Sequence, residues 1–208
     1  MLFGSKHMKR QVLLPLLFIP LFASFSAAAL QTSHSAEDAA PSTSQRPKWS
    51  EADRKALLTR AQHGDVGAQF WLGAGYEQGR SGKTDFKEAL KWLRKAAAQG
   101  DSDAQNMLGQ MYGDGEGVRQ NYVLAAKWYR KAAEHVPDLG GAGQGRNNLG
   151  MLYMDGLGVS KDYVQAYMWF RLTNFESNLS YAKAYMTPAQ VLEAERMATE
   201  WKRHHPQR

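Results

Sequence analysis

Cysteine is the residue that this 208-residue sequence lacks altogether. Its absence excludes disulfides, cysteine-ligated zinc, a catalytic thiol and a lipid-modified cysteine anchor. Histidine is scarce, with six residues, and none of them stands in a Ser-His-Asp arrangement or an H-E-x-x-H spacing. The sequence therefore predicts no enzyme, no metal site and no cofactor.

A strong excess of charge of one sign is also missing. The chain has 26 Lys and Arg against 20 Asp and Glu, a net charge of +6 at pH 7. Lys6, Lys9 and Arg10 lie in an N-terminal segment that we expect to be removed, which leaves a net charge of +3. Nucleic-acid binding needs a clustered basic face, and so mild a balance gives little support for one. We therefore expect no nucleic acid among the partners.

Residues 1–29 have the parts of a secretory signal peptide. A basic start is followed by the apolar run VLLPLLFIPLFASF and by small residues that end at Ala29. The run has 14 residues, whereas a membrane-spanning helix needs about 20. Cleavage near Ala29 predicts a periplasmic or secreted protein without a membrane anchor. An uncleaved anchor is the alternative, and the start codon can be that of Met1 or Met8.

Residues 30–48, LQTSHSAEDAAPSTSQRPK, are rich in Ser, Thr, Pro and Ala. So little apolar surface does not offset the entropy lost on ordering. This composition predicts a flexible polar linker.

From residue 49 onward the sequence repeats itself. The stretch ALKWLRKAAAQ at 89–99 returns as AAKWYRKAAEH at 125–135, an offset of 36, and partly as AYMWFRLTNFE at 166–176, a further 41 along. The five additional residues fall in HVPDLGGAGQG, whose glycines and proline predict a longer loop. The same offsets relate the Leu-Gly steps Leu72-Gly73, Leu108-Gly109 and Leu149-Gly150.

Each repeat has the pattern of a helix–turn–helix pair. Apolar residues recur three and four positions apart in both halves. Asp85, Asn121 and Asp162 stand where the second helix of each pair needs an N-cap. Ser102 and Gln105 have the spacing of a capping box for a first helix, and TPAQ at 187–190 starts a terminal helix.

The stretch AQNMLGQMYGDGEGVRQNYVLAAKWYRKAAE closely resembles a Sel1-like repeat, a relative of the tetratricopeptide repeat. The resemblance implies an all-α fold: a right-handed α/α superhelical solenoid of about three repeats with capping helices at both ends. Residues 49–173 form the array with its N-terminal half-repeat cap, and residues 174–208 the C-terminal capping helices. It also implies an adaptor that binds another protein or peptide of the bacterial cell envelope.

The first helices of such a solenoid line its concave side. Residues just before the Leu-Gly step, and one turn beyond it, are therefore candidates for partner binding: Trp71, Asn106, Met107, Met111, Arg146, Asn147 and Asn148. Asn106 and Asn147 are equivalent and predict an amide ladder for a peptide backbone. The alternative is that the apolar members pack against the neighbouring first helix.

Two other functions stay open on the sequence alone. Exposed aromatic residues beside amides predict binding of an envelope glycan or polysaccharide, and a flat apolar patch is typical of an assembly factor that joins two subunits. The identity of the partner and the oligomeric state are not encoded in any motif.

Overall fold

The computed structural model describes residues 48–135, 140–173 and 175–206. The predicted signal peptide and residues 30–47 of the predicted linker lie outside this part of the chain. All regular structure in the described ranges is helical, in the order α1 (Glu51–Gln62), α2 (Val66–Glu77), α3 (Phe86–Ala98), α4 (Ser102–Asp114), α5 (Tyr122–Ala133), α6 (Gly141–Asp155), α7 (Tyr163–Arg171), α8 (Glu176–Lys183) and α9 (Pro188–His204).

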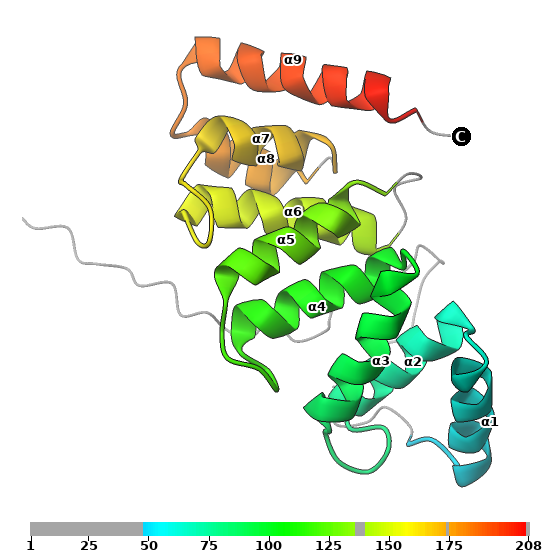
Figure 1. Cartoon of the computed structure of the whole chain (residues 1–208). Coiled ribbons are helices and arrows are strands. Elements are labelled where there is room, and N and C mark those ends of the chain that lie inside the picture. Colours follow the sequence, from blue (N-terminus) through cyan, green and yellow to red (C-terminus); the bar gives the residue numbers. More distant parts are fainter. Residues whose placement is uncertain (1–47, 136–139, 174, 207–208) are drawn as a thin grey trace, which may run out of the picture. The chain divides into compact units, whose positions relative to one another are not determined.

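The helices pair and stack in chain order (Figure 1). The pairs α2–α3, α4–α5 and α6–α7 are the three predicted repeats, and each second helix also contacts the first helix of the next pair. Helix α1 packs on α2 as a lone second helix, while α8 and α9 pack on α7. The first helices α2, α4 and α6 also contact one another in succession. The predicted all-helical solenoid with capping helices is therefore confirmed.

Local sequence signals set the helix starts. The side chains of Asp85, Asn121 and Asp162 accept hydrogen bonds from backbone N–H groups in the first turns of α3, α5 and α7, as predicted. The capping box of Thr187 and Gln190 opens α9. The predicted box of Ser102 and Gln105 is wrong, because the N-cap of α4 is Asp101, which accepts from the amide of Ala104 at 2.7 Å.

The glycine of each Leu-Gly step sits where the second helix of the same repeat crosses the first. A Cβ atom placed on Gly73, Gly109 or Gly150 would lie less than 3.0 Å from a side-chain atom of Leu93, Tyr129 or Phe170, respectively. These three partners are themselves equivalent positions in the repeat. The step therefore encodes a close helix–helix crossing.

The core is divided along the array into three clusters. The N-terminal cluster is small and centres on Leu72 and Trp92. The middle one lies between α3 and α4, around Leu93 and Leu108. The C-terminal one is the largest and joins α5, α6 and α7 to the capping helices. Each cluster is shared by adjacent helices, which is how a solenoid is held together.

Candidate functional site

The surface presented by the first helices α2, α4, α6 and by α8 is here called the inner face. The two positions before each Leu-Gly step lie on it, and the predicted binding residues Trp71, Asn106, Met107, Asn147 and Asn148 occupy these positions. Their surroundings differ from repeat to repeat.

Asn106 is used inside the protein. Its side chain is 3% exposed, donates to Gln144 Oε1 at 2.9 Å, and accepts from Asn148 Nδ2 at 3.0 Å. The amide thus joins α4 to α6. The prediction that Asn106 is open to a peptide is wrong, because both ends of its amide are already paired with the next repeat.

The same relation recurs one repeat further on. Asn147, equivalent to Asn106, accepts a hydrogen bond from Asn178 Nδ2 on α8. Asn147 and Asn148 are both half-buried. These amide hydrogen bonds form an internal ladder that runs from helix to helix, so Asn106 does not take part in the ladder predicted for a partner's peptide backbone. A binding role for the partly exposed Asn147 and Asn148 stays a prediction.

The two methionines lie one turn apart on the same side of α4 and differ in burial. Met111 is 0% exposed and belongs to the middle core cluster, so its predicted place in a groove is wrong. Met107 is half-buried against the same cluster, as is Phe70 of the preceding repeat. Packing against the neighbouring first helix, the alternative interpretation, describes Met107 as well, although part of its side chain stays accessible.

Arg146 is also buried, at 1% exposure. Its Nε donates to the carbonyl oxygen of Ala133 and its Nη2 to that of His135, each at 2.9 Å. Its guanidinium lies 4.7 Å from the centre of the Trp201 ring of α9. The prediction that Arg146 faces a partner is wrong, because carbonyls and a ring of the protein itself surround it.

Arg146 belongs to a column of contacts that the sequence comparison missed. Gln69 donates from Nε2 to the carbonyl of Ala61 at 3.0 Å, and Gln105 to that of Ala97 at 3.1 Å. Gln69, Gln105 and Arg146 are related by the repeat offsets, and so are their acceptors. The signal was available: a long polar side chain recurs in every copy beside residues that are small and buried.

One member of this column is incompletely paired. Gln69 Oε1 accepts from Gln99 Nε2 at 2.8 Å, whereas Gln105 Oε1 is buried and has no hydrogen-bond partner among the described residues. The residue equivalent to Gln99 is His135, which borders a surface hollow together with Gln105. The repeat-to-repeat exchange of glutamine for histidine thus removes one amide donor.

Trp71 is the predicted site residue that is most exposed, at 54%. Its equivalents, Met107 and Asn148, each pack on or bond to a preceding repeat. Trp71 belongs to the first repeat, and in the part of the chain that the structure describes no first helix precedes it, so its ring stays open. The ring of Phe70 lies 5.4 Å away at a 58° tilt and extends the apolar surface.

A second aromatic surface lies near the other end of the array. Tyr163 and Tyr185 stack with ring centres 5.1 Å apart and planes 19° apart, and Tyr181 meets Tyr185 edge-on at 5.5 Å. Tyr181 and Tyr185 are both about half exposed. A hydrogen bond to Tyr185, together with burial, raises the pKa of the Tyr181 hydroxyl.

The described residues hold no group of three or more metal-ligating side chains that could bind an ion. Among the helices described, none is long and apolar enough to span a membrane. Ser180 and Lys183 have an S-x-x-K spacing on α8, yet both side chains are exposed to solvent.

These features define a repeat protein of the helix-pair solenoid class. The Sel1 repeat model matches residues 66–101, 102–135 and 144–173, which are the three helix pairs. The chain belongs to the Sel1 repeat family. Repeats of this family generally mediate protein–protein interaction, and proteins with this fold are typically non-enzymatic scaffolds.

The solved structures that resemble the chain include the following two. One is a protective antigen present in uropathogenic Escherichia coli strains, with an SLR fold: 27% identity, TM-score 0.54, covering 74% of this chain and 41% of that chain. The other is a Sel1 repeat protein from Oxalobacter formigenes: 34% identity, TM-score 0.49, covering 72% of this chain and 98% of that chain. The chain thus spans less than half the length of the first protein. No curated protein matches the sequence.

Proposed function

We propose that this protein is an exported adaptor of the bacterial cell envelope, and that it binds another protein through the N-terminal end of its inner face. The single observation that carries the proposal is the exposure of Trp71, which is 54%. Large exposed aromatic rings are costly to leave in water and are enriched at protein interfaces. Trp71 is open because, among the described residues, no first helix of a preceding repeat packs on its ring.

The surroundings of Trp71 suit a protein partner. Phe70 supplies a second ring beside it, and Met107 on the next first helix is partly accessible and adaptable in shape. Such a surface offers an aromatic anchor with softer neighbours, the arrangement typical of an interface hot spot. The N-terminal segment of the sequence supports export, and cleavage near Ala29 would free the array in the periplasm or outside the cell.

The test is site-specific photo-crosslinking in the native envelope fraction. A photoreactive phenylalanine analogue replaces Trp71 in one variant and Leu192, which is 71% exposed on α9, in a matched control. We expect one dominant protein adduct from position 71 and none of the same mass from position 192. Identical adduct patterns from the two positions, or none from position 71, would contradict the proposed surface.

Glycan binding is the second candidate, and the cluster of Tyr163, Tyr181 and Tyr185 favours it. Exposed aromatic platforms with hydroxyl groups can stack on sugar rings and hydrogen-bond to them. Replacement of Tyr181 and Tyr185 by alanine should then abolish retention on envelope polysaccharide and leave the Trp71 crosslink intact. Retention that survives this double substitution would remove the glycan candidate.

A further inference from the structure

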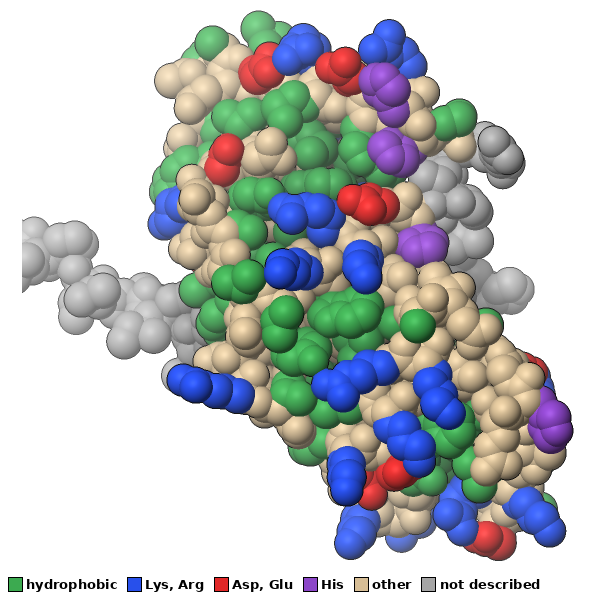
Figure 2. Space-filling view, in the orientation of Figure 1, with side chains coloured by type: hydrophobic (Ala, Val, Ile, Leu, Met, Phe, Trp, Pro, Cys, Tyr) green, Lys and Arg blue, Asp and Glu red, His purple; other side chains and the backbone are tan. Residues whose placement is uncertain are grey.

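The exposed sides of α3 and α5 carry a repeated set of basic residues. The stretch KWLRK of α3 and the stretch KWYRK of α5 are related by the offset of 36. Figure 2 shows Lys and Arg side chains gathered over this part of the molecule, with few acidic groups between them. The set consists of Lys91, Arg94, Lys95, Lys127, Arg130 and Lys131, and we call it the basic face.

The mild net charge of the chain concealed this cluster. Acidic residues are spread over the helix caps and over α9, whereas α3 and α5 with their caps hold three, Asp85, Glu88 and Glu134. Glu88 pairs with Lys91 at 3.0 Å and accepts from Trp92 Nε1 at 3.1 Å. The other five cations form no ion pair with a described residue.

The two arginines of the basic face are held in place without being neutralised. Arg94 Nη2 donates to the hydroxyl of Tyr112 at 3.0 Å, and Arg130 Nη2 to that of Tyr153 at 2.8 Å. Each bond crosses to the first helix of the next repeat. A tyrosine hydroxyl is uncharged near neutral pH, so each guanidinium keeps its full charge and its remaining donors. Fixing the side chain in advance lowers the entropic cost of binding an anion.

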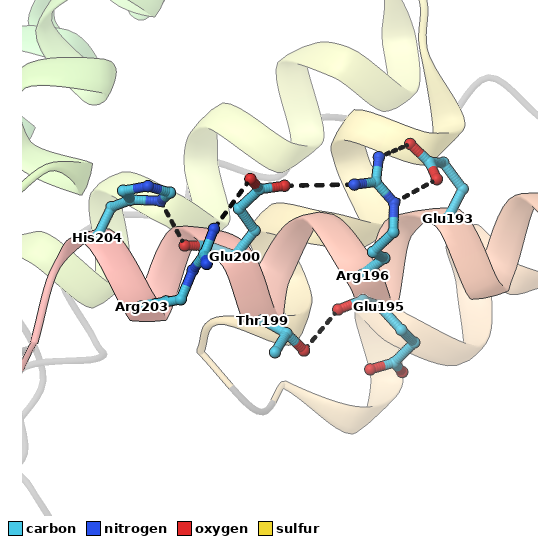
Figure 3. Close-up of polar contacts among 7 residues, drawn as sticks. All are labelled: Glu193, Glu195, Arg196, Thr199, Glu200, Arg203 and His204. Carbon is cyan, nitrogen blue, oxygen red and sulfur yellow. Dashed lines mark hydrogen bonds and ion pairs between the residues drawn. The ribbon is translucent and has the colours of Figure 1, made fainter.

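In the third repeat, the equivalent arginine is paired with a carboxylate of the protein itself. Arg171 is the residue equivalent to Arg94 and Arg130, and its Nε donates to Glu195 of α9, at 2.9 Å to Oε2 and 3.2 Å to Oε1. Glu195 projects from α9 away from the exposed network of Glu193 and Arg196 (Figure 3). Of the three equivalent arginines, Arg171 is the one beside α9, and α9 supplies it with a carboxylate.

We propose that the basic face binds an acidic segment of a partner protein, and that two of its carboxylates engage Arg94 and Arg130 as Glu195 engages Arg171. Arginine binds carboxylates through paired N–H donors more specifically than lysine does. The lysines beside each arginine add attraction at longer range. An acidic protein is favoured over a membrane or a nucleic acid because the chain itself places a glutamate at this position.

The basic face lies on α3 and α5, whereas Trp71 lies on α2, so the two surfaces can be tested independently. An adaptor needs two contact surfaces, and the basic face would be the second. Replacement of Trp71 by alanine should accordingly leave binding at the basic face unchanged.

The test uses a fluorescein-labelled oligoglutamate peptide and fluorescence anisotropy at low ionic strength. We expect the unmodified protein to bind the peptide, with affinity falling as salt is added. The double substitution Arg94→Gln/Arg130→Gln should weaken binding about tenfold. The double substitution Arg196→Gln/Arg203→Gln removes the same charge from the exposed side of α9 (Figure 3) and should weaken it less than about twofold.

Two further variants guard against a folding defect. Arg94→Lys/Arg130→Lys keeps the charge but loses the guanidinium fork, and should weaken binding about threefold. Lys127→Gln/Lys131→Gln removes two exposed cations of α5 without touching the arginine–tyrosine hydrogen bonds, and should also weaken it. Circular dichroism melting shows whether each variant is folded.

Three outcomes would overturn the proposal. The first is absence of binding to the unmodified protein, and the second is an equal loss in the Arg94/Arg130 and Arg196/Arg203 variants, which would reflect net charge alone. The third is binding to phosphatidylglycerol vesicles in place of the peptide, lost in the Arg94/Arg130 variant, which would make the basic face a membrane-docking surface.

Discussion

Arg146 donates from Nε to the carbonyl oxygen of Ala133, in the same place where Gln105 reaches Ala97 one repeat earlier. A buried arginine here has replaced an uncharged amide. The guanidinium is accommodated because it reaches a second carbonyl, that of His135, and lies over the Trp201 ring, which also stacks on His205 with ring centres 4.1 Å apart. The substitution thereby ties the third repeat to the C-terminal helix.

Replacing Arg146 separates these contributions. Arg146→Ala should lower the free energy of unfolding by about 2 to 4 kcal/mol, because it opens a cavity and leaves two carbonyls unpaired. Arg146→Gln should cost about 1 to 2 kcal/mol, because the amide can still reach Ala133 but not Trp201. Urea unfolding followed by circular dichroism measures both. Equal losses would mean that the carbonyl contact contributes nothing.

Glycine at the Leu-Gly step should be irreplaceable. Gly109→Ala should cost about 1 to 3 kcal/mol, because the added methyl group would overlap the Tyr129 ring. Gly67→Ala is the control: its nearest neighbour would be Asp65 Oδ1 at an ordinary 3.5 Å, so the alanine should be neutral or stabilise α2 by up to about 1 kcal/mol. Thermal melts of the two variants should shift apart; a similar shift would refute the close crossing.

His135 occupies the position that Gln99 holds one repeat earlier. His135→Gln should raise the free energy of unfolding by about 0.5 to 1.5 kcal/mol, because the new amide can donate to the unpaired Gln105 Oε1. The reverse change, Gln99→His, should destabilise the first repeat by a similar amount, since it removes the donor to Gln69. Denaturant titrations of both variants check the pair. A loss of stability in His135→Gln would show that the histidine ring is already paired in solution.

The internal amide ladder predicts a stability effect at Asn106. Asn106→Ala should cost about 1 to 3 kcal/mol, because Gln144 and Asn148 lose their partner in a buried setting. Asn147→Ala should cost less, since Asn147 makes one such bond and is half-buried. Chemical denaturation measures both changes. An Asn106→Ala protein of undiminished stability would restore a role in partner binding.

Two acidic residues at helix ends should make stability depend on pH. Burial raises the pKa of Asp114 and Asp155, the last residues of α4 and α6, and the carbonyl end of each helix also disfavours negative charge. The folded state therefore binds their protons more tightly than the unfolded state, so their ionised forms cost stability above the raised pKa.

The double substitution Asp114→Asn/Asp155→Asn should accordingly stabilise the protein by about 0.5 to 1 kcal/mol at pH 7. The gain should disappear below the ordinary aspartate pKa of 3.8, where both carboxyls are protonated in either state. Melting temperatures at a series of pH values test this. A gain that persists in acid would assign the effect to hydrogen bonding rather than to charge.

The helices and their caps could be predicted from the sequence because the determinants are local. Asp85, Asn121 and Asp162 bond to amides two or three residues away. The Leu-Gly step was recognisable because its partner lies within the same repeat. What remained hidden depends on partners in other repeats, such as Gln144 and Asn148 for Asn106, 38 and 42 residues distant.

The candidate site likewise depends on contacts between repeats that the sequence does not reveal. Equivalent positions such as Trp71, Met107 and Asn148 were correctly aligned, but alignment alone does not show which copy has a preceding neighbour. The predicted set therefore mixed a buried arginine and a core methionine with one exposed ring. Net charge misled in a similar way, because a sum over the chain does not show that the cations of α3 and α5 share one face.

Each repeat packs chiefly on its immediate neighbours, so these contacts do not fix how many repeats the array holds. Asp101 caps α4 as Asp65 caps α2, and each aspartate accepts from the amide of the third residue of its helix, Ala104 or Ala68. A tandem duplication of residues 66–101 would keep the offset of 36 residues at that junction. The added copy would therefore bring the hydrogen-bond donors, the acceptors and the crossing glycine that its neighbours need. Unequal recombination at this point would thus add one complete helix pair in a single genetic event and would leave the capping helices and the fold unchanged.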